Sequence, residues 1–211
     1  MRKVFKAAFV AMTLSLFLVP VFASNYLTNG DFQTGSWSPW VNVTYNGGTA
    51  SIITDGTYVA YFQSTDTQRA YAYQTMSSSV SSGTGIFQFQ VKILQYASNG
   101  HGPAAQVTNA VSSPLNVILI LMDSSSVREQ FAGCPVQTVM SSGLSSGWHT
   151  IKATIDYSAG KATIYVDGTQ KLQTTCTSIP AMYVVWIGQP DLNGSGTVAR
   201  KSEFDNVYSG T

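Results

Sequence analysis

The sequence predicts an all-β protein, a two-sheet antiparallel β-sandwich of the jelly-roll type. Segments such as residues 86–93 alternate apolar and polar side chains, which is typical of half-buried antiparallel strands. Turn-forming pairs, for example Asp55-Gly56 and Asp167-Gly168, separate these segments at short intervals. After residue 23 no stretch combines the 3.6-residue period with the caps of an amphipathic helix, so strands and turns are expected throughout.

The composition of the 211-residue chain favours one apolar core and excludes several classes of protein. Hydrophobic residues make up 44% of the chain, aromatic residues 12% and charged residues 10%, against about 25% charged residues in an ordinary soluble domain. So many aromatic side chains exclude intrinsic disorder. The formal net charge of +1 leaves no basic surplus to neutralise phosphates, so we expect no nucleic acid partner.

The first 23 residues have the composition of a secretory signal peptide. Three basic side chains precede the apolar residues 7–19, and Ala23 offers the small side chain that a signal peptidase reads. The apolar run is too short for a membrane span, and no later run approaches the required length. We therefore expect a secreted, extracellular protein with a single β-sandwich domain over residues 24–211; an uncleaved anchor is the alternative.

Residues 86–93 form the clearest predicted strand. Two phenylalanines and two aliphatic residues share the face expected in the core, and Gln88, Gln90 and Lys92 share the other. This polar face is either a solvated convex surface or the floor of a ligand-binding groove with Tyr96 at its end.

The middle of the chain predicts one long connection and one buried strand. Residues 97–114 form the longest irregular segment, which is either a functional or mobile loop or a plain surface excursion. Residues 115–122 are apolar except for Asn116 and rich in Ile and Val. They predict a central strand that is covered on both faces.

Residues 147–168 predict a hairpin. Trp148 opens a strand that ends at Asp156, and a second strand ends at the turn-forming pair Asp167-Gly168. With its spacing of Trp, aliphatic residues, Tyr and Asp-Gly, the segment resembles laminin-G-like and other concanavalin A-like lectin domains. The resemblance implies a two-sheet jelly roll that binds glycans on a concave face or at an edge.

Both ends of the domain add to the resemblance. Residues 204–208 resemble the closing strand of the same laminin-G-like and concanavalin A-like group, and residues 29–40 (NGDFQ followed by Trp) are similar to the start of secreted carbohydrate-binding jelly rolls. This resemblance implies a structural calcium ion that ties the opening to the last strand, with Asp31 and Asp205 as ligands. Gln33 stands where a Glu is frequent; surface aspartates in turns are the alternative.

Aromatic residues are the main candidates for a sugar-binding surface. Trp37 and Trp40 lie in a loop-like segment, where one of them is either an exposed sugar platform or part of a lid over the sandwich edge. Tyr71 and Tyr73 share one face of a short strand and form a candidate stacking strip. The two remaining tryptophans are expected in the core.

Two cysteines, Cys134 and Cys176, remain in the expected mature chain. In an exported protein an even pair predicts a disulfide. Their spacing does not fit a zinc site, and no histidine is near them in sequence.

Few residues suggest catalysis, so we assign no catalytic residue. Glu129 and Glu203 are the two glutamates after residue 23, and a glycoside hydrolase needs a carboxylate pair. His101 and His149 are isolated in sequence, so neither suggests a catalytic triad. His149 alternates with Ile151 and is interpreted as an interior side chain.

The sequence therefore predicts a secreted, non-catalytic, lectin-like domain that recognises an extracellular or cell-surface polysaccharide or glycoconjugate. The first alternative is a structural subunit of an extracellular filament, sheath or surface layer, because low net charge favours self-association. The second alternative is a small glycoside hydrolase.

Overall fold

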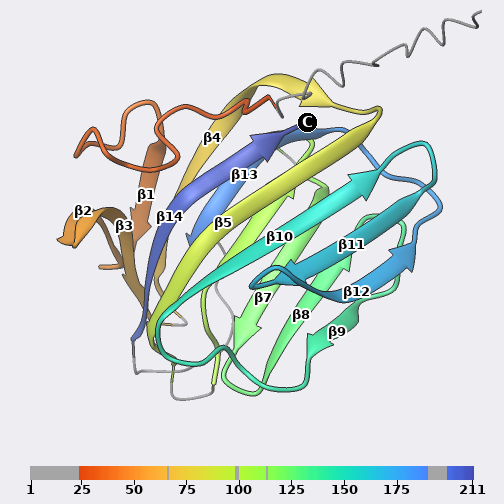
Figure 1. Ribbon diagram of the computed structural model, residues 1–211. Helices are drawn as coiled ribbons and strands as arrows, with labels where there is room; N and C mark the ends of the chain where they lie inside the picture. Colours follow the sequence, from red (N-terminus) through yellow and green to blue (C-terminus); the bar gives the residue numbers. More distant parts are fainter. Residues whose placement is uncertain (1–23, 66, 98–99, 113, 190–198) are drawn as a thin grey trace, which may run out of the picture.

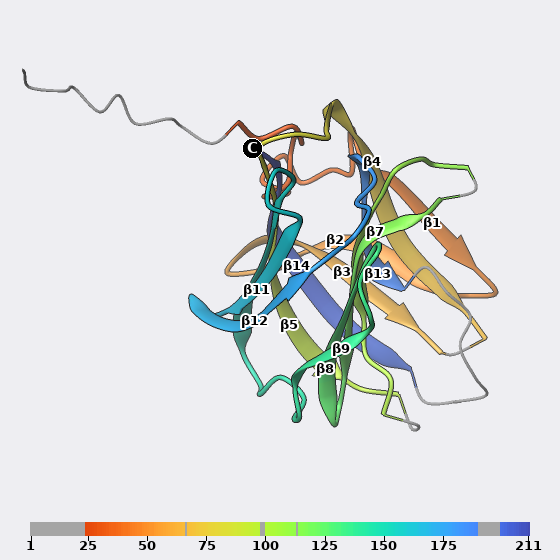
Figure 2. The same ribbon diagram turned by 90° about the vertical axis from the view of Figure 1, so that its right-hand side faces the viewer.

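The computed structural model places the strands in two antiparallel sheets of seven strands each, which pack face to face (Figures 1 and 2). None of the described residues belongs to a helix, and none therefore forms a helix that could cross a membrane. The predicted secretory signal lies outside the described residues. The structure describes residues 24–65, 67–97, 100–112, 114–189 and 199–211.

Sheet A lies in front in Figure 1 and has the strand order β12-β11-β10-β5-β14-β3-β2. Its strands are β2 (Thr49–Asp55), β3 (Thr57–Ser64), β5 (Thr84–Gln95), β10 (Trp148–Asp156), β11 (Lys161–Val166), β12 (Thr169–Thr175) and β14 (Arg200–Gly210).

Sheet B lies behind sheet A and has the order β1-β4-β13-β6-β7-β8-β9. Its strands are β1 (Val41–Tyr45), β4 (Arg69–Val80), β6 (Ala104–Thr108), β7 (Asn116–Asp123), β8 (Ser126–Phe131), β9 (Gln137–Met140) and β13 (Met182–Gln189). In each sheet, pairs of consecutive strands lie beside strands from distant parts of the chain, for example β5 beside β14 and β6 beside β13, as in a jelly roll.

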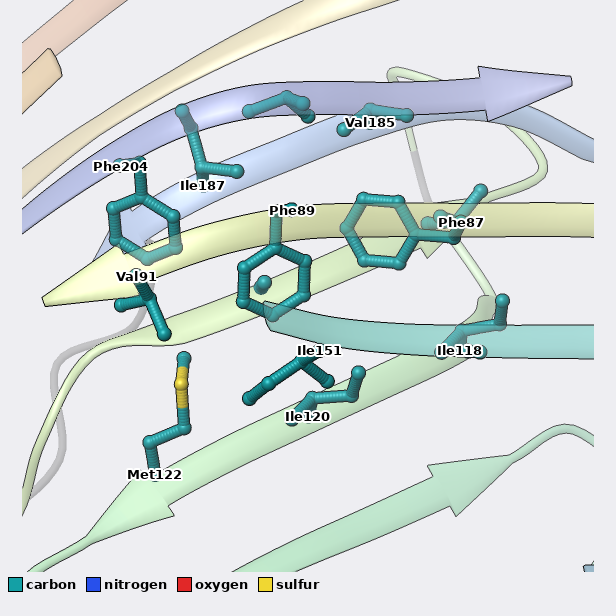
Figure 3. Packing of buried hydrophobic residues seen from close by; sticks show 14 of the residues in the cluster. Phe87, Phe89, Val91, Ile118, Ile120, Met122, Ile151, Val185, Ile187 and Phe204 are labelled. Carbon is teal, nitrogen blue, oxygen red and sulfur yellow. The ribbon is translucent and has the colours of Figure 1, made fainter. Parts of the chain in front are cut away.

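The core lies between the sheets, where the inward side chains of both sheets meet (Figure 3). From sheet A, the Phe89 ring lies 5.2 Å from the Phe87 ring and 5.7 Å from the Phe204 ring, between centroids. From sheet B, Ile118 and Ile120 of β7 face these rings. All five side chains are fully buried, and each contributes about 1.5–3 kcal/mol relative to an exposed side chain.

The strong strand predictions are confirmed, and one loop prediction is wrong. β5 contains residues 86–93 with the expected face in the core, and β7 is an inner strand of sheet B that is buried along most of its length. The segment 97–114 is not irregular throughout, since it contains the fully buried β6 between β13 and β7. Ala, Gln and Thr in β6 carry too weak an alternation to reveal this strand.

The predicted hairpin and disulfide are both present. β10 pairs with β11, and β11 turns into β12 through Asp167 and Gly168, whose φ angles are 51° and 74°. Positive φ at both positions is the geometry of a type I′ turn, which Asp-Gly favours. Cys134, after β8, is bonded to Cys176, after β12, so the disulfide joins sheet B to sheet A.

Candidate functional site

Three aromatic side chains lie together on the outer face of sheet B. Tyr71 and Tyr73 project outward from β4, because the alternate residues Ala70 and Ala72 are buried in the core. On the neighbouring strand β13, the Trp186 ring centroid lies 4.6 Å from that of Tyr73 and 5.6 Å from that of Tyr71. We call these three residues the aromatic cluster. The predicted pair of tyrosines is thus extended by a third ring.

Trp186 was expected in the core, but its side chain points away from the core. Val185 and Ile187 point into the core, so Trp186 points outward, although it is only 8% exposed. Its indole N–H donates to Thr108 Oγ1 of β6 over 2.9 Å. Gln106 is its cross-strand partner on β6. Because β13 is apolar at nearly every position, its sequence does not reveal which side chains face outward.

A charged pocket of about 330 Å³ lies toward the other side of sheet B, where β7 ends and β8 begins. Arg128 Nη2 donates to Asp123 Oδ2 over 2.6 Å, and Arg200 Nη1 donates to the Gly102 carbonyl over 3.4 Å. Burial lowers the pKa of Arg200 to about 10, so its guanidinium remains charged at neutral pH. We call this the basic pocket; it is lined by His101, Gly102, Leu121, Asp123, Arg128, Gln189 and Arg200.

The strand register places the aromatic cluster and the basic pocket in one row across sheet B. Tyr71 pairs with Gly188, Gly188 with Ala104, Ala104 with Leu121, and Leu121 with Arg128. Neighbouring strands are about 4.8 Å apart, so this row extends over roughly 19 Å. A face of this width can contact several sugar residues of one chain.

The other predicted ligand residues do not join this face. Gln88 and Gln90 project from the outer face of sheet A, on the opposite side of the sandwich, and Gln90 Oε1 accepts a hydrogen bond from Asn206 Nδ2 over 2.8 Å. Tyr96 is half-buried against the core, and its hydroxyl donates to the Leu144 carbonyl over 3.3 Å. The predicted groove that combined Gln88, Gln90 and Tyr96 is therefore not formed.

Trp37 and Trp40 pack into the edge of the sandwich. Trp40 is 4% exposed, and its indole N–H donates to the Thr28 and Asn29 carbonyls over 3.2 and 3.1 Å. The half-buried Trp37 ring contacts the Phe62 ring at 5.7 Å between centroids. The burial of Trp40 contradicts its interpretation as a sugar platform and agrees with the alternative of a lid over the sandwich edge.

Asp31 and Asp205 lie where the opening segment meets β14, as the calcium prediction requires. The backbone N–H of Val207 donates to the Gly30 carbonyl over 2.8 Å. Burial raises the pKa of Asp205, and the negative charge of Asp31 raises it further, so a cation here would relieve their repulsion. In the described part of the chain no three His, Cys, Asp or Glu residues could share a metal ion; calcium would need backbone carbonyl and water ligands as well.

Glu129 and Glu203 do not form a catalytic pair. Glu129 lies on the inward face of β8 and is 1% exposed. Glu203 points from the outer face of β14 in sheet A toward Lys92. Sheet A therefore separates the two carboxylates.

Glu203 has a different carboxylate neighbour. Lys92 Nζ lies 2.6 Å from Asp55 Oδ2 and 3.4 Å from Glu203 Oε2. The hydrogen bond from Lys92 lowers the pKa of Asp55, whereas burial raises the pKa of Glu203 despite the attraction of Lys92. Trp148, 37% exposed rather than in the core, has its ring centroid 5.9 Å from the same Nζ.

Comparison with known proteins shows the fold. No protein-family model and no curated protein sequence matches this chain. A sialidase is similar over 90% of this chain (TM-score 0.65, 13% identity), although the match spans only 19% of that sialidase chain. An alginate lyase from Corynebacterium sp. is similar over 82% of this chain and 94% of its own (TM-score 0.56, 13% identity).

Botulinum neurotoxin type C, whose cell entry depends on interaction with two ganglioside molecules, is similar over 82% of this chain and 44% of its own (TM-score 0.57, 12% identity). At such low identity these similarities establish the architecture rather than the activity. The chain has the concanavalin A-like jelly-roll fold that the sequence predicted.

Proposed function

We propose that this protein is a secreted, lectin-like domain that binds an acidic polysaccharide or glycoconjugate, without chemistry at that site, across the outer face of sheet B. The contact of Trp186 with Tyr71 and Tyr73 carries this proposal, because clustered aromatic rings offer apolar surface to the C–H groups of sugars. Arg128 in the same face, and Arg200, which is largely buried on β14 of sheet A but also lines the basic pocket, supply charge-assisted hydrogen bonds for carboxylate or sulfate groups.

The side chains around the aromatic cluster support binding rather than chemistry there. The polar groups beside it, Gln106 and Thr108, do not titrate near neutral pH and so offer no general acid or base. The structural neighbours include an alginate lyase and a ganglioside-dependent toxin, which supports a carbohydrate ligand in general.

Tryptophan fluorescence of the purified protein, titrated with alginate and with dextran, tests the proposal. Alginate carries a carboxylate on each sugar and dextran carries none. We expect saturable binding of alginate only, and about a tenfold weaker Kd in Tyr73→Ala, equivalent to ~1.4 kcal/mol. Arg128→Gln should weaken alginate binding similarly, whereas the control Tyr165→Ala, on sheet A, should match the wild type.

Equal binding by the wild type, Tyr73→Ala and Arg128→Gln would contradict the proposed site. Sedimentation of the same samples tests the structural-subunit alternative. Absence of any glycan response together with large or fibrous particles would favour that alternative.

The Asp55–Lys92–Glu203 contacts favour a second candidate function, a glycoside hydrolase on the outer face of sheet A. Two carboxylates with pKa values shifted in opposite directions suit acid–base cleavage of a glycosidic bond. A reducing-end assay on the same polysaccharides tests it. The activity should disappear in Glu203→Gln, and an activity that survives this substitution would exclude Glu203 from the reaction.

A further inference from the structure

A serine, a histidine and an aspartate form one chain of contacts at the edge between the two sheets. Ser145 Oγ lies 2.9 Å from His149 Nε2, and His149 Nδ1 lies 2.8 Å from Asp167 Oδ2. Ser145 belongs to the connection between β9 and β10, His149 to β10, and Asp167 to the turn between β11 and β12. His149 is isolated in sequence and mostly buried, as expected, but the β11–β12 turn brings Asp167 against it, so its isolation in sequence did not exclude a triad.

The backbone holds Asp167 in place on both sides. Its Oδ1 accepts a hydrogen bond from the Thr150 N–H over 2.9 Å, and its own N–H donates to the Thr150 carbonyl over 2.8 Å. Burial opposes ionisation of Asp167, but the hydrogen bonds from His149 and the Thr150 N–H outweigh it and lower its pKa. The carboxylate is therefore ionised at neutral pH.

The ionised carboxylate determines which nitrogen of His149 carries the proton. An ionised carboxylate can accept hydrogen bonds but cannot donate them, so the proton of neutral His149 lies on Nδ1, facing Asp167. Nε2 is then free of a proton and accepts from the Ser145 hydroxyl. The Ser145 carbonyl oxygen, 3.3 Å from the same Nε2, is the longer contact. This orders nucleophile, base and orienting carboxylate as acyl-transfer chemistry requires.

A pocket of about 390 Å³ opens beside these three residues. Met140, Leu144 and Val166 give it an apolar wall that suits an acyl chain. Lys171 also lines it and brings a cation to the same pocket. Ser145 is exposed, so a substrate can approach its hydroxyl from solvent.

We propose that Ser145, His149 and Asp167 form the active site of a carboxylic-ester hydrolase for short acyl esters. This activity is separate from the proposed polysaccharide site. Ser145 Oγ attacks the ester carbonyl carbon while His149 Nε2 takes the hydroxyl proton. The C–O bond to the leaving alcohol then breaks, and the alcohol oxygen takes that proton from His149.

Water completes the reaction. His149 removes a proton from a water molecule, the water oxygen attacks the acyl–serine carbonyl, and the acid leaves while Ser145 regains its proton. Esters rather than amides are expected, because the Asp167 side chain is 52% exposed, and an exposed carboxylate stabilises the histidinium less than a buried one would.

Hydrolysis of p-nitrophenyl acetate and labelling with a fluorophosphonate probe test the proposal in the purified full chain. The wild type should hydrolyse the ester above the buffer rate, and peptide mass spectrometry should find the probe on Ser145. Ser145→Ala should abolish labelling and lower kcat at least a hundredfold. His149→Asn should have the same two effects. Ser146→Ala alters the exposed serine next in the chain, outside the contacts described, and should keep wild-type activity.

Wild-type labelling tests the nucleophile without depending on how any variant folds, and circular dichroism checks the fold of Ser145→Ala and His149→Asn. Labelling of another residue, hydrolysis no faster than buffer, or a folded Ser145→Ala with wild-type activity would each overturn the proposal.

Discussion

Glu129→Gln tests whether a carboxyl group buried without partners makes stability depend on pH. Glu129 lies among apolar side chains on the inward face of β8, opposite Ile120. Neither carboxylate oxygen has a hydrogen-bond partner among the residues that the structure describes. Burial raises its pKa from 4.5 to about 7; the Phe131 backbone N–H lies near enough to offset part of this shift but makes no hydrogen bond to either oxygen.

The shift converts directly into a change in unfolding free energy. Because the pKa is higher in the folded state, the folded protein binds this proton more tightly than the unfolded chain does. The stabilisation is complete below the unfolded pKa of 4.5 and is lost as pH rises through about 7. At 1.36 kcal/mol per pKa unit, the loss is about 3 kcal/mol.

Gln resembles the protonated form of Glu129 and does not titrate. The two proteins should therefore have nearly equal unfolding free energies below the unfolded pKa of 4.5. Above the folded pKa of about 7, Glu129→Gln should be the more stable by about 3 kcal/mol. Urea unfolding followed by tryptophan fluorescence at a series of pH values measures this difference.

Asp156→Asn is the matched control with the opposite sign. Hydrogen bonds from the Ser158 hydroxyl and the Ala159 N–H lower the pKa of Asp156, so its ionised form stabilises the fold. This variant should lose stability relative to the wild type as pH rises through the lowered folded-state pKa to the ordinary value of 3.8, and should stay less stable than the wild type at higher pH. If Glu129→Gln and the wild type instead lose stability in parallel across neutral pH, the assignment of an unpartnered buried carboxyl is refuted.

Three further predictions concern the disulfide, the core and the calcium proposal. Cys134→Ser should lower the free energy of unfolding by about 4 kcal/mol, because the disulfide closes a loop of intermediate length. Reduction of the wild-type disulfide should lower the free energy of unfolding by the same amount in the urea assay. Equal stability of the variant and the oxidised wild type would contradict this prediction. Phe89→Ala should cost about 3–5 kcal/mol through the cavity it leaves, and a cost near zero in the same assay would contradict its central position. Calcium should raise the Tm of the wild type but not of Asp31→Asn, and an equal rise in both would remove Asp31 from the site.

Local pattern alone predicted much of this fold. The alternation of phenylalanine with glutamine in residues 86–93 defined both faces of β5, because side chains of a strand point to opposite sides in turn. The turn after β11 could be predicted because Asp-Gly favours positive φ. Cys134 and Cys176 left a single possible disulfide.

The candidate site could be predicted only in part. Tyr71 and Tyr73 share a face by strand period, but their contact with Trp186 depends on the pairing of β4 with β13. Glu129 falls on an inward position between Val127 and Phe131, yet a glutamate in sequence looks like a surface or catalytic residue.

The sequence by itself determined the class of fold, the faces of the strongest strands, the turns and the disulfide, because each depends on neighbours in the chain or on a single possible pairing. Only the tertiary structure decided which residues share a site. Tyr73 meets Trp186, and His149 meets Asp167, through strand pairing and register, and these are set by the packing of the whole core rather than by any local segment.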